Sequence, residues 1–251
     1  MTAKPIEEGA TIACFRSAEY PCSYLPARRA TTIFIDPEIT PDARLYARLA
    51  AAGFRRSGVH FYRPRCSDCA ACVPLRLEVT RFLPDRSQRR TQRRNADLDT
   101  RVLLEADLDR HFALYTRYLQ GRHAASSMVE HTPEEFVSFL TAPGTETLFV
   151  EFLDGGRLIA VAVVDVLRDG LSAIYTFFDP LERKRALGVN AVLWQIEETR
   201  RRGLKWLYLG YWIAECGNMS YKNRFRPYQV LSDGRWTECG STDSSSGPCP
   251  G

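Results

Sequence analysis

The chain has 251 residues, of which 45% are hydrophobic, 11% aromatic and 25% charged. This composition is that of a globular protein and excludes a wholly disordered, collagen-like or simple coiled-coil chain. The length allows one large domain or two smaller ones. The longest apolar stretch, residues 158–167, is far shorter than the roughly 18 residues of a membrane-spanning helix, and no apolar signal sequence follows Met1. We therefore expect a soluble, cytoplasmic protein that does not enter a membrane.

The first part of the chain is rich in turns and poor in long periodic segments. Residues 32–35 and 59–62 are predicted to be short strands, and residues 75–82 an alternating strand. Residues 43–52 have the spacing of a helix. These elements predict a small α+β domain over residues 1–103.

Three cysteines lie within seven residues of this part of the chain, at Cys66, Cys69 and Cys72. Their thiols could bind one zinc ion or an iron-sulfur cluster, and a zinc ion would need a fourth ligand. Cys22, in a turn flanked by proline, is the first candidate for that ligand and His60 the second. The alternative is four reduced, partly buried thiols that bind no metal.

Positive charge is concentrated between Phe54 and Arg94, where eleven arginines stand against three acidic residues. The local charge is +8, although the net charge of the chain is only +4. Residues 86–95 alternate arginines with Ser, Thr, Gln and Asn, a mixture that can bind a phosphate backbone. A solvated charged surface is the alternative. The arginines of this segment are Arg86, Arg89, Arg90, Arg93 and Arg94.

The second part of the chain is more regular. Two helices are predicted at residues 107–119 and 132–140. Three strands joined by tight turns follow, then a helix that ends before Gly203 and a last strand. A strand, a crossover helix and a strand imply parallel pairing. These later elements span residues 148–153, 158–167, 171–178, 189–202 and 206–212.

This order of elements is typical of the GNAT-like acyltransferases. The predicted fold is therefore α/β, with a GNAT-like domain over residues 104–236 that is preceded by the smaller, cysteine-containing α+β domain. Residues 237–251, rich in Ser, Gly and Pro, are expected to be a disordered tail.

Two features of the second domain bear on its substrate. An acyltransferase that uses coenzyme A usually binds its pyrophosphate through a glycine-rich loop, whereas residues 183–191 contain only Gly188. The acyl donor is thus expected to differ from coenzyme A. Asp179, which precedes a proline at a strand end, and Tyr211, which follows a glycine, are predicted to line a pocket.

Six segments, in order along nearly the whole chain, resemble the bacterial leucyl-tRNA-protein transferases, which are related to the eukaryotic arginyl-tRNA-protein transferases. The segments are residues 21–28, 62–76, 82–90, 175–180, 207–213 and 219–227. The resemblance implies transfer of leucine from leucyl-tRNA to the α-amino group of proteins that begin with Asp or Glu, which marks them for degradation. Residues 215–218 depart from the family pattern, in which a basic residue is expected next to Met219, and Cys216 resembles the eukaryotic branch.

With this resemblance, the reaction assigns roles to particular residues. An aminoacyl-tRNA is an activated ester, so transfer needs a neutral amine, a site for the oxyanion and a proton path, but no cofactor. We expect backbone N–H groups near Gly210 and Tyr211 to bind the oxyanion, and Asp179 or Tyr175 to relay the proton. The acidic side chain of the acceptor is assigned to Lys222, with Arg224 or Arg226 as a further partner.

The tRNA is assigned to the arginines of residues 86–94 together with Arg183, Lys184 and Arg185. We expect a monomer. The alternatives are an acetyltransferase that uses acetyl-coenzyme A and a non-catalytic RNA-binding module.

Overall fold

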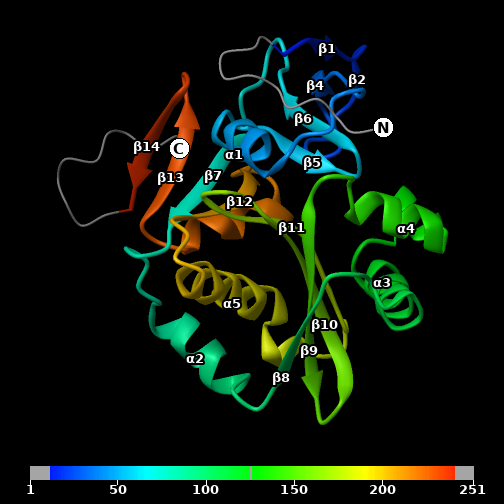
Figure 1. Ribbon diagram of the computed structural model, residues 1–251, viewed down its shortest axis with the longest axis vertical. Helices are drawn as coiled ribbons and strands as arrows, with labels where there is room; N and C mark the ends of the chain where they lie inside the picture. Colours follow the sequence, from blue (N-terminus) through cyan, green and yellow to red (C-terminus); the bar gives the residue numbers. More distant parts are fainter. Residues whose placement is uncertain (1–11, 125, 241–251) are drawn as a thin grey trace.

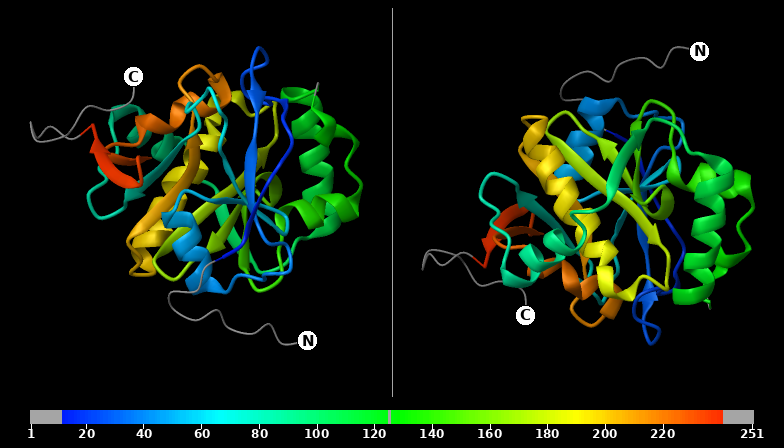
Figure 2. Two further views of the ribbon diagram at one scale, coloured as in Figure 1. Left: turned by 90° about the horizontal axis from the view of Figure 1, so that it is seen from above. Right: turned by 90° about the horizontal axis from the view of Figure 1, so that it is seen from below.

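The computed structural model describes residues 12–124 and 126–240. Its centre is a mixed sheet of eight strands, with helices on both faces (Figures 1 and 2). The strands, in spatial order, are β14 (Arg235–Cys239), β13 (Tyr228–Ser232), β7 (Val73–Glu78), β12 (Trp206–Trp212), β11 (Gly170–Phe178), β10 (Arg157–Val166), β9 (Glu146–Asp154) and β8 (Asp99–Leu103).

The alternation of side chains along β10 shows how the two faces of the sheet are filled. Ala160, Ala162 and Val164 pack in the core beneath α5 (Leu187–Arg201), whereas Val161 and Val163 face α3 (Leu108–Arg122) and α4 (Pro133–Leu140). Every one of these five residues is fully buried. Both faces of this strand are therefore covered, which explains why its sequence is almost continuously apolar.

A second, smaller part of the fold lies at one end of the large sheet (Figure 1). It holds a four-stranded sheet, a two-stranded ribbon and the helix α1 (Ala43–Ala51). The four-stranded sheet has the order β1 (Cys14–Arg16), β4 (Thr32–Ile35), β6 (His60–Pro64) and β5 (Arg55–Ser57), and the ribbon pairs β2 (Tyr20–Pro21) with β3 (Arg29–Ala30). The remaining helices are α2 (Arg86–Arg94), α6 (Gly217–Ser220) and the 3-10 turns η1 (Ser127–Glu130), η2 (Arg183–Arg185) and η3 (Tyr221–Arg224).

The mixed α/β class and the order of the later elements are confirmed. Strands β9, β10 and β11 form the predicted antiparallel meander, and β11 pairs with β12 in parallel across the crossover helix α5. The helix predicted at residues 132–140 is α4, which Thr132 and Glu135 open with a capping box. No helix among the described residues is both long and apolar enough to cross a membrane.

Strand pairing crosses the boundary that we placed between residues 103 and 104. β7 lies between β12 and β13, and β8 forms the edge beside β9. The physical reason is burial, because Leu75 and Leu77 of β7 are at most 1% exposed and the backbone of a buried strand must be hydrogen-bonded on both sides. The predicted strand at 75–82 is in fact β7, which ends at Glu78.

The tail begins later than we predicted, because β14 continues to Cys239. β14 pairs with β13 through a turn in which Asp233 and Gly234 both have positive φ angles, of 50° and 75°. An Asp-Gly pair is favoured in such a hairpin turn and was the sequence signal that we missed. Residues 241–251 of the predicted tail lie outside the described residues.

A buried ion pair joins the small sheet to the large one. Asp165 of β10 accepts hydrogen bonds from Nε and Nη2 of Arg56 in β5, each at 2.7 Å. Its oxygens also accept from Tyr46 Oη and Thr147 Oγ1, each at 2.8 Å. Neither side chain of the ion pair is exposed. The four donors satisfy the carboxylate, which is what makes a buried charge tolerable.

We predict that Asp165→Asn lowers the free energy of unfolding by about 3–5 kcal/mol, because it leaves the Arg56 guanidinium buried without a counter-charge. Urea denaturation followed by circular dichroism would measure the loss. The matched control is Asp99→Asn, at an exposed position of β8, which should change stability by less than about 0.5 kcal/mol. Equal effects of the two substitutions would contradict a structural role for the pair.

Candidate functional site

The two parallel strands of the large sheet separate soon after they begin to pair. β11 and β12 are in register only where Gly170, Leu171 and Ser172 face residues 206–208. Just beyond, each strand contains one extra residue without a partner on its antiparallel neighbour, Ile174 in β11 and Leu209 in β12. Such bulges bend strands. They open a gap at the carboxyl ends of the pair, where ligands bind in many α/β folds.

Arg55, from β5 of the small sheet, reaches into this gap. Its Nη1 donates to Ser172 Oγ at 3.0 Å and its Nη2 donates to the carbonyl oxygen of Ala173, both in β11. On the other side of the gap it meets Gly210 of β12, where an added Cβ would lie 3.2 Å from Arg55 Nε. Nothing in the sequence distinguishes Arg55 from the other ten arginines of the basic segment.

Lys222 lies beside the same strand. Its Nζ donates to the carbonyl oxygen of Tyr211 at 2.8 Å and lies 3.2 Å from Met219 Sδ. The residue is only 8% exposed, and burial lowers the pKa of its ammonium group to about 7, with a further lowering by Arg55. Among the described residues, no carboxylate forms an ion pair with Lys222 or Arg55. Two buried cationic groups thus flank the segment Gly210–Tyr211 without a counter-ion.

Tyr211 is buried, and its hydroxyl donates to the carbonyl oxygens of Gly53 at 2.9 Å and Tyr62 at 3.2 Å. Burial raises the pKa of this hydroxyl well above its usual value. The side chain therefore fastens β12 to the small sheet. The backbone carbonyl oxygen of Tyr211 accepts the hydrogen bond from Lys222.

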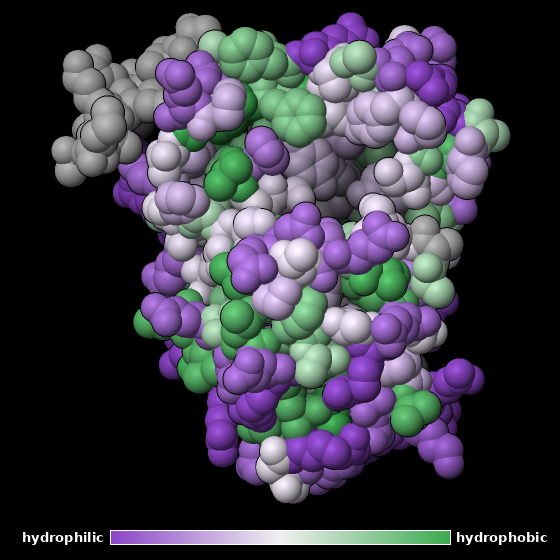
Figure 3. Space-filling view, turned by 90° about the vertical axis from the view of Figure 1, so that its right-hand side faces the viewer, coloured by the Kyte–Doolittle hydropathy of each residue, from purple (hydrophilic) through white to green (hydrophobic). Residues whose placement is uncertain are grey.

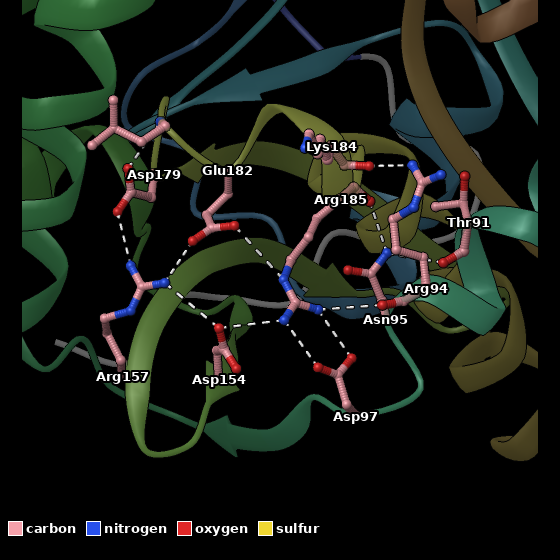
Figure 4. A network of polar contacts seen from close by, with 11 residues as sticks. Thr91, Arg94, Asn95, Asp97, Asp154, Arg157, Asp179, Glu182, Lys184 and Arg185 are labelled. Atoms are coloured by element: carbon pink, nitrogen blue, oxygen red, sulfur yellow. Dashed lines mark hydrogen bonds and ion pairs between the residues drawn. The ribbon is translucent and has the colours of Figure 1, made fainter.

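The other two predicted catalytic residues lie in different surroundings. Tyr175 packs edge-on against Phe139 and Tyr115 on the face of the sheet that α3 and α4 cover, and burial raises the pKa of its hydroxyl. Asp179 accepts from Arg157 Nη1 at 3.2 Å and from the backbone N–H of Leu181 at 3.0 Å (Figure 4). Among the described residues, no hydrogen bond or ring contact joins Tyr175, Asp179 and Tyr211 to one another.

The structure also separates the three predicted acceptor-binding residues. Lys222 is buried, whereas Arg224 and Arg226 are exposed. Arg226 Nε donates to the carbonyl oxygen of Asn223 at 3.2 Å. Lys222 hydrogen-bonds to β12 through its Nζ, whereas the hydrogen bond of Arg226 is to Asn223.

The four cysteines Cys22, Cys66, Cys69 and Cys72 line one cavity together with Tyr24 and Pro64. All four are free thiols. Burial and the neighbouring thiols raise the pKa of Cys72 to about 12. No group of three His, Cys, Asp or Glu residues in the described part of the chain has an arrangement that would hold a metal ion. The structure gives no support to the predicted zinc or iron-sulfur site.

The arginines of residues 86–94 form the outer face of α2. Gln88, Thr91 and Asn95 are buried beneath the helix, and the five arginines are exposed. Asp85 opens the helix with a capping box to Gln88. Within the described residues, no carboxylate pairs with any of these five arginines.

α2 also holds the basic turn η2 in place (Figure 4). Asn95 Nδ2 donates to the carbonyl oxygen of Arg185 at 2.7 Å, and Arg94 donates to that of Lys184. The two predicted tRNA-binding segments are therefore neighbours. Arg185 differs from the others, because it is paired with Asp97 at 2.9 Å, Asp154 at 3.3 Å and Glu182 at 3.7 Å.

The molecule is hollowed on the face from which α3 and α4 are seen. The hollow lies in the upper half of this view, at the level where the small sheet meets the rest of the fold (Figure 3). The residues that line it are mostly of intermediate hydropathy rather than strongly apolar. A substrate could therefore approach the junction of the two sheets from this side.

Comparison with known proteins identifies the family. Residues 20–90 match the N-terminal model of the arginine-tRNA-protein transferases, and residues 110–232 match the C-terminal model. The chain belongs to this family. Aspartate/glutamate leucyltransferases from Marinobacter nauticus and Hahella chejuensis are 52% and 50% identical to it, over 93% and 90% of this chain and 98% and 97% of their own lengths.

The relative from Saccharophagus degradans, also named an aspartate/glutamate leucyltransferase, is 48% identical over 88% of this chain and 94% of its own length. The chain is thus an aminoacyltransferase. Among solved structures, that of L-PGS from Bacillus licheniformis has a TM-score of 0.45 and 10% identity, over 66% of this chain and 48% of that one, a likeness that decides nothing here.

We predict that Gly210→Ala lowers kcat/KM for aminoacyl transfer by about ten- to a hundred-fold, because the added Cβ displaces Arg55 in the gap. The matched control is Gly203→Ala, since Gly203 also has a positive φ, of 68°, but has no atom within 4 Å of the added Cβ. Both variants should lose a similar amount of stability, about 1–2 kcal/mol from the strained backbone. An equal loss of transfer in both would contradict a specific role for the gap.

Proposed function

We propose that this protein transfers leucine from leucyl-tRNA to the α-amino group of proteins that begin with Asp or Glu, and thereby marks them for degradation. The observation that carries the proposal is the near-complete match to aspartate/glutamate leucyltransferases at about 50% identity. The buried, uncompensated Lys222 beside β12 supports it, because an acidic acceptor would supply the missing counter-charge.

The reaction is an aminolysis of an ester. The neutral amine of the acceptor attacks the leucyl carbonyl carbon, a C–N bond forms, and the C–O bond to the ribose breaks. The amine loses a proton and the ribose oxygen gains one, so no cofactor, oxidant or metal is required. The residues have to hold the two substrates together, stabilise the oxyanion and move the proton.

We assign the oxyanion to backbone N–H groups near Gly210 and Tyr211, at the gap between β11 and β12. Asp179, just after the end of β11, or Tyr175 within that strand would relay the proton. We assign the acidic acceptor side chain to Lys222, with Arg224 or Arg226 on the exposed approach to it.

We further propose that the tRNA lies along α2 and η2, where the five arginines of α2 and Arg183 are exposed and have no acidic partner among the described residues, whereas Arg185 is ion-paired. A GNAT-like arrangement of the second domain, a cytoplasmic location and a monomeric protein complete the proposal. The separation of two parallel strands beside a crossover helix supports the GNAT-like arrangement.

We predict that charge reversal of Arg89 and Arg90 to Glu weakens binding of leucyl-tRNA and reduces the salt dependence of binding, because fewer counterions are released. Electrophoretic or fluorescence titrations at several salt concentrations would measure the slope. The control Arg16→Glu with Arg235→Glu makes the same change in net charge at exposed positions of β1 and β14, far from α2 (Figure 1). A slope unchanged by the first variant, or reduced equally by both, would rule out α2 as the phosphate-binding surface.

We predict that Lys222→Met lowers kcat/KM for peptides that begin with Asp or Glu by roughly thirty- to a thousand-fold, about 2–4 kcal/mol, because it removes a partly buried charged hydrogen bond. Binding of leucyl-tRNA should barely change. Lys205→Met, at an exposed lysine, is the control and should leave both quantities unchanged. Weaker tRNA binding in Lys222→Met would instead assign this segment to the donor.

The pKa of Lys222 gives this prediction a pH dependence. The groups that act on its ammonium are Arg55 and Cys216, and burial brings its pKa to about 7. The cation is present below pH 7 and is lost as the pH rises through 7. The ratio of kcat/KM for an Asp acceptor to that for an Asn acceptor should therefore decrease above pH 7. Titration of the acceptor amine affects both values and cancels in this ratio. A preference that increases with pH would contradict the assignment.

A further inference from the structure

Arg55 is a buried cation whose charge no carboxylate of the described residues neutralises. It is 9% exposed, and its two hydrogen-bond acceptors, Ser172 Oγ and the carbonyl oxygen of Ala173, are neutral. Its neighbour along β5, Arg56, has the opposite arrangement, because Asp165 neutralises it. Tyr46 lies between Asp165 and Ser172 and hydrogen-bonds to both. The oxygens of Asp165 already accept hydrogen bonds from Arg56, Tyr46 and Thr147.

The guanidinium also has donors to spare. A guanidinium carries five N–H groups, and the hydrogen bonds of Arg55 to β11 use one on each of its terminal nitrogens. Two terminal N–H groups and the one on Nε remain. Burying a cation with unused donors is costly unless an anion completes the site. The planar fork of arginine suits a carboxylate, which can accept two parallel hydrogen bonds.

Arg55 and Lys222 both contact the same short segment of β12. Arg55 lies against Gly210, and Lys222 donates to the carbonyl oxygen of Tyr211. Gly210 has a φ angle of 80° and lacks the Cβ that would crowd the guanidinium, so the backbone is shaped for this approach. The surroundings of the two cations include the thiol of Cys216 and the hydroxyls of Tyr62 and Tyr211, whose pKa values are raised by burial.

We propose that Arg55 and Lys222 together form the receptor for the side-chain carboxylate of the acceptor's N-terminal Asp or Glu, and that Arg55 is the permanent cation of this pair. The inference deepens the proposed function and rests on it. Arginine stays protonated throughout the physiological pH range, whereas Lys222 loses its charge near neutrality. Arg55 therefore sets a selectivity for acidic acceptors that persists above pH 8.

The test compares acceptor peptides that are identical except for an N-terminal Asp or Asn. Arg55→Gln should lower kcat/KM for the Asp peptide by about ten- to a hundred-fold while that for the Asn peptide stays nearly the same. Arg55→Lys should recover part of the lost preference. Arg63→Gln, which removes an arginine from the neighbouring strand β6, is the matched control and should leave the ratio unchanged.

The ratio protects the test from effects on folding. Arg55 also binds β11, so its loss can reduce the folded fraction, but this lowers both rates by the same factor and leaves their ratio unaltered. A second measurement uses unreactive acceptors, peptides capped with succinate (Asp without its amine) or with its monoamide. In Arg55→Gln, the inhibition constant of the succinyl peptide should rise at pH 8.5 and that of the amide should not.

Three results would overturn the inference. Equal losses for Asp and Asn peptides would make Arg55 only a structural link between β5 and β11. A raised KM for leucyl-tRNA with an unchanged Asp preference would assign the cation to a phosphate of the donor. If Arg55→Gln leaves the ratio of kcat/KM for the Asp and Asn peptides unchanged at pH 8.5, other groups set the selectivity. Failure of the proposed function looks different, since the wild-type protein would then transfer no leucine or show no preference for Asp.

Discussion

The buried pair of Arg56 and Asp165 is the interaction on which the arrangement of the site depends. It ties β5, a short strand of the small sheet, to the middle of the large sheet. Because Arg55 is the adjacent residue, fixing Arg56 also fixes where Arg55 enters the gap between β11 and β12. Tyr46 extends the same network by bridging Asp165 and Ser172, the residue that accepts from Arg55. This network holds the two sheets in a fixed position relative to each other at the site.

Much of the fold followed from the sequence because its signals are local. The alternation of apolar residues, the turn glycines and the capping box of Thr132 gave the meander, α4 and the crossover. The insertion of β7 between β12 and β13 was not predictable in this way, since it is a pairing between segments more than 100 residues apart. No pattern within residues 73–78 identifies the partner strand.

The site was predicted less completely, and for a different reason. Lys222 was found through resemblance, and the arginines of α2 through their density. Arg55 was not found, because only burial distinguishes it from Arg89 or Arg90, and burial is a property of the folded chain. The spacing of Cys66, Cys69 and Cys72 pointed to a metal, yet the described thiols share a cavity without the geometry of ligands. Short spacing in the sequence brings the thiols close together, but metal coordination also requires that their sulfur atoms point to one centre.

The excess of arginine between residues 54 and 94 serves physically different purposes within one segment. Arg56 is neutralised inside the fold, Arg55 is buried without a counter-charge, and the arginines of α2 are solvated. Exposed charges are screened by salt over about 8–10 Å, whereas buried charges are screened far less. Under the proposed function, both the tRNA and the acidic acceptor carry negative charge. The tRNA is bound by exposed arginines and the acceptor by buried cations. Affinity for tRNA along α2 responds to ionic strength, whereas choice of acceptor in the gap is set by desolvation and geometry.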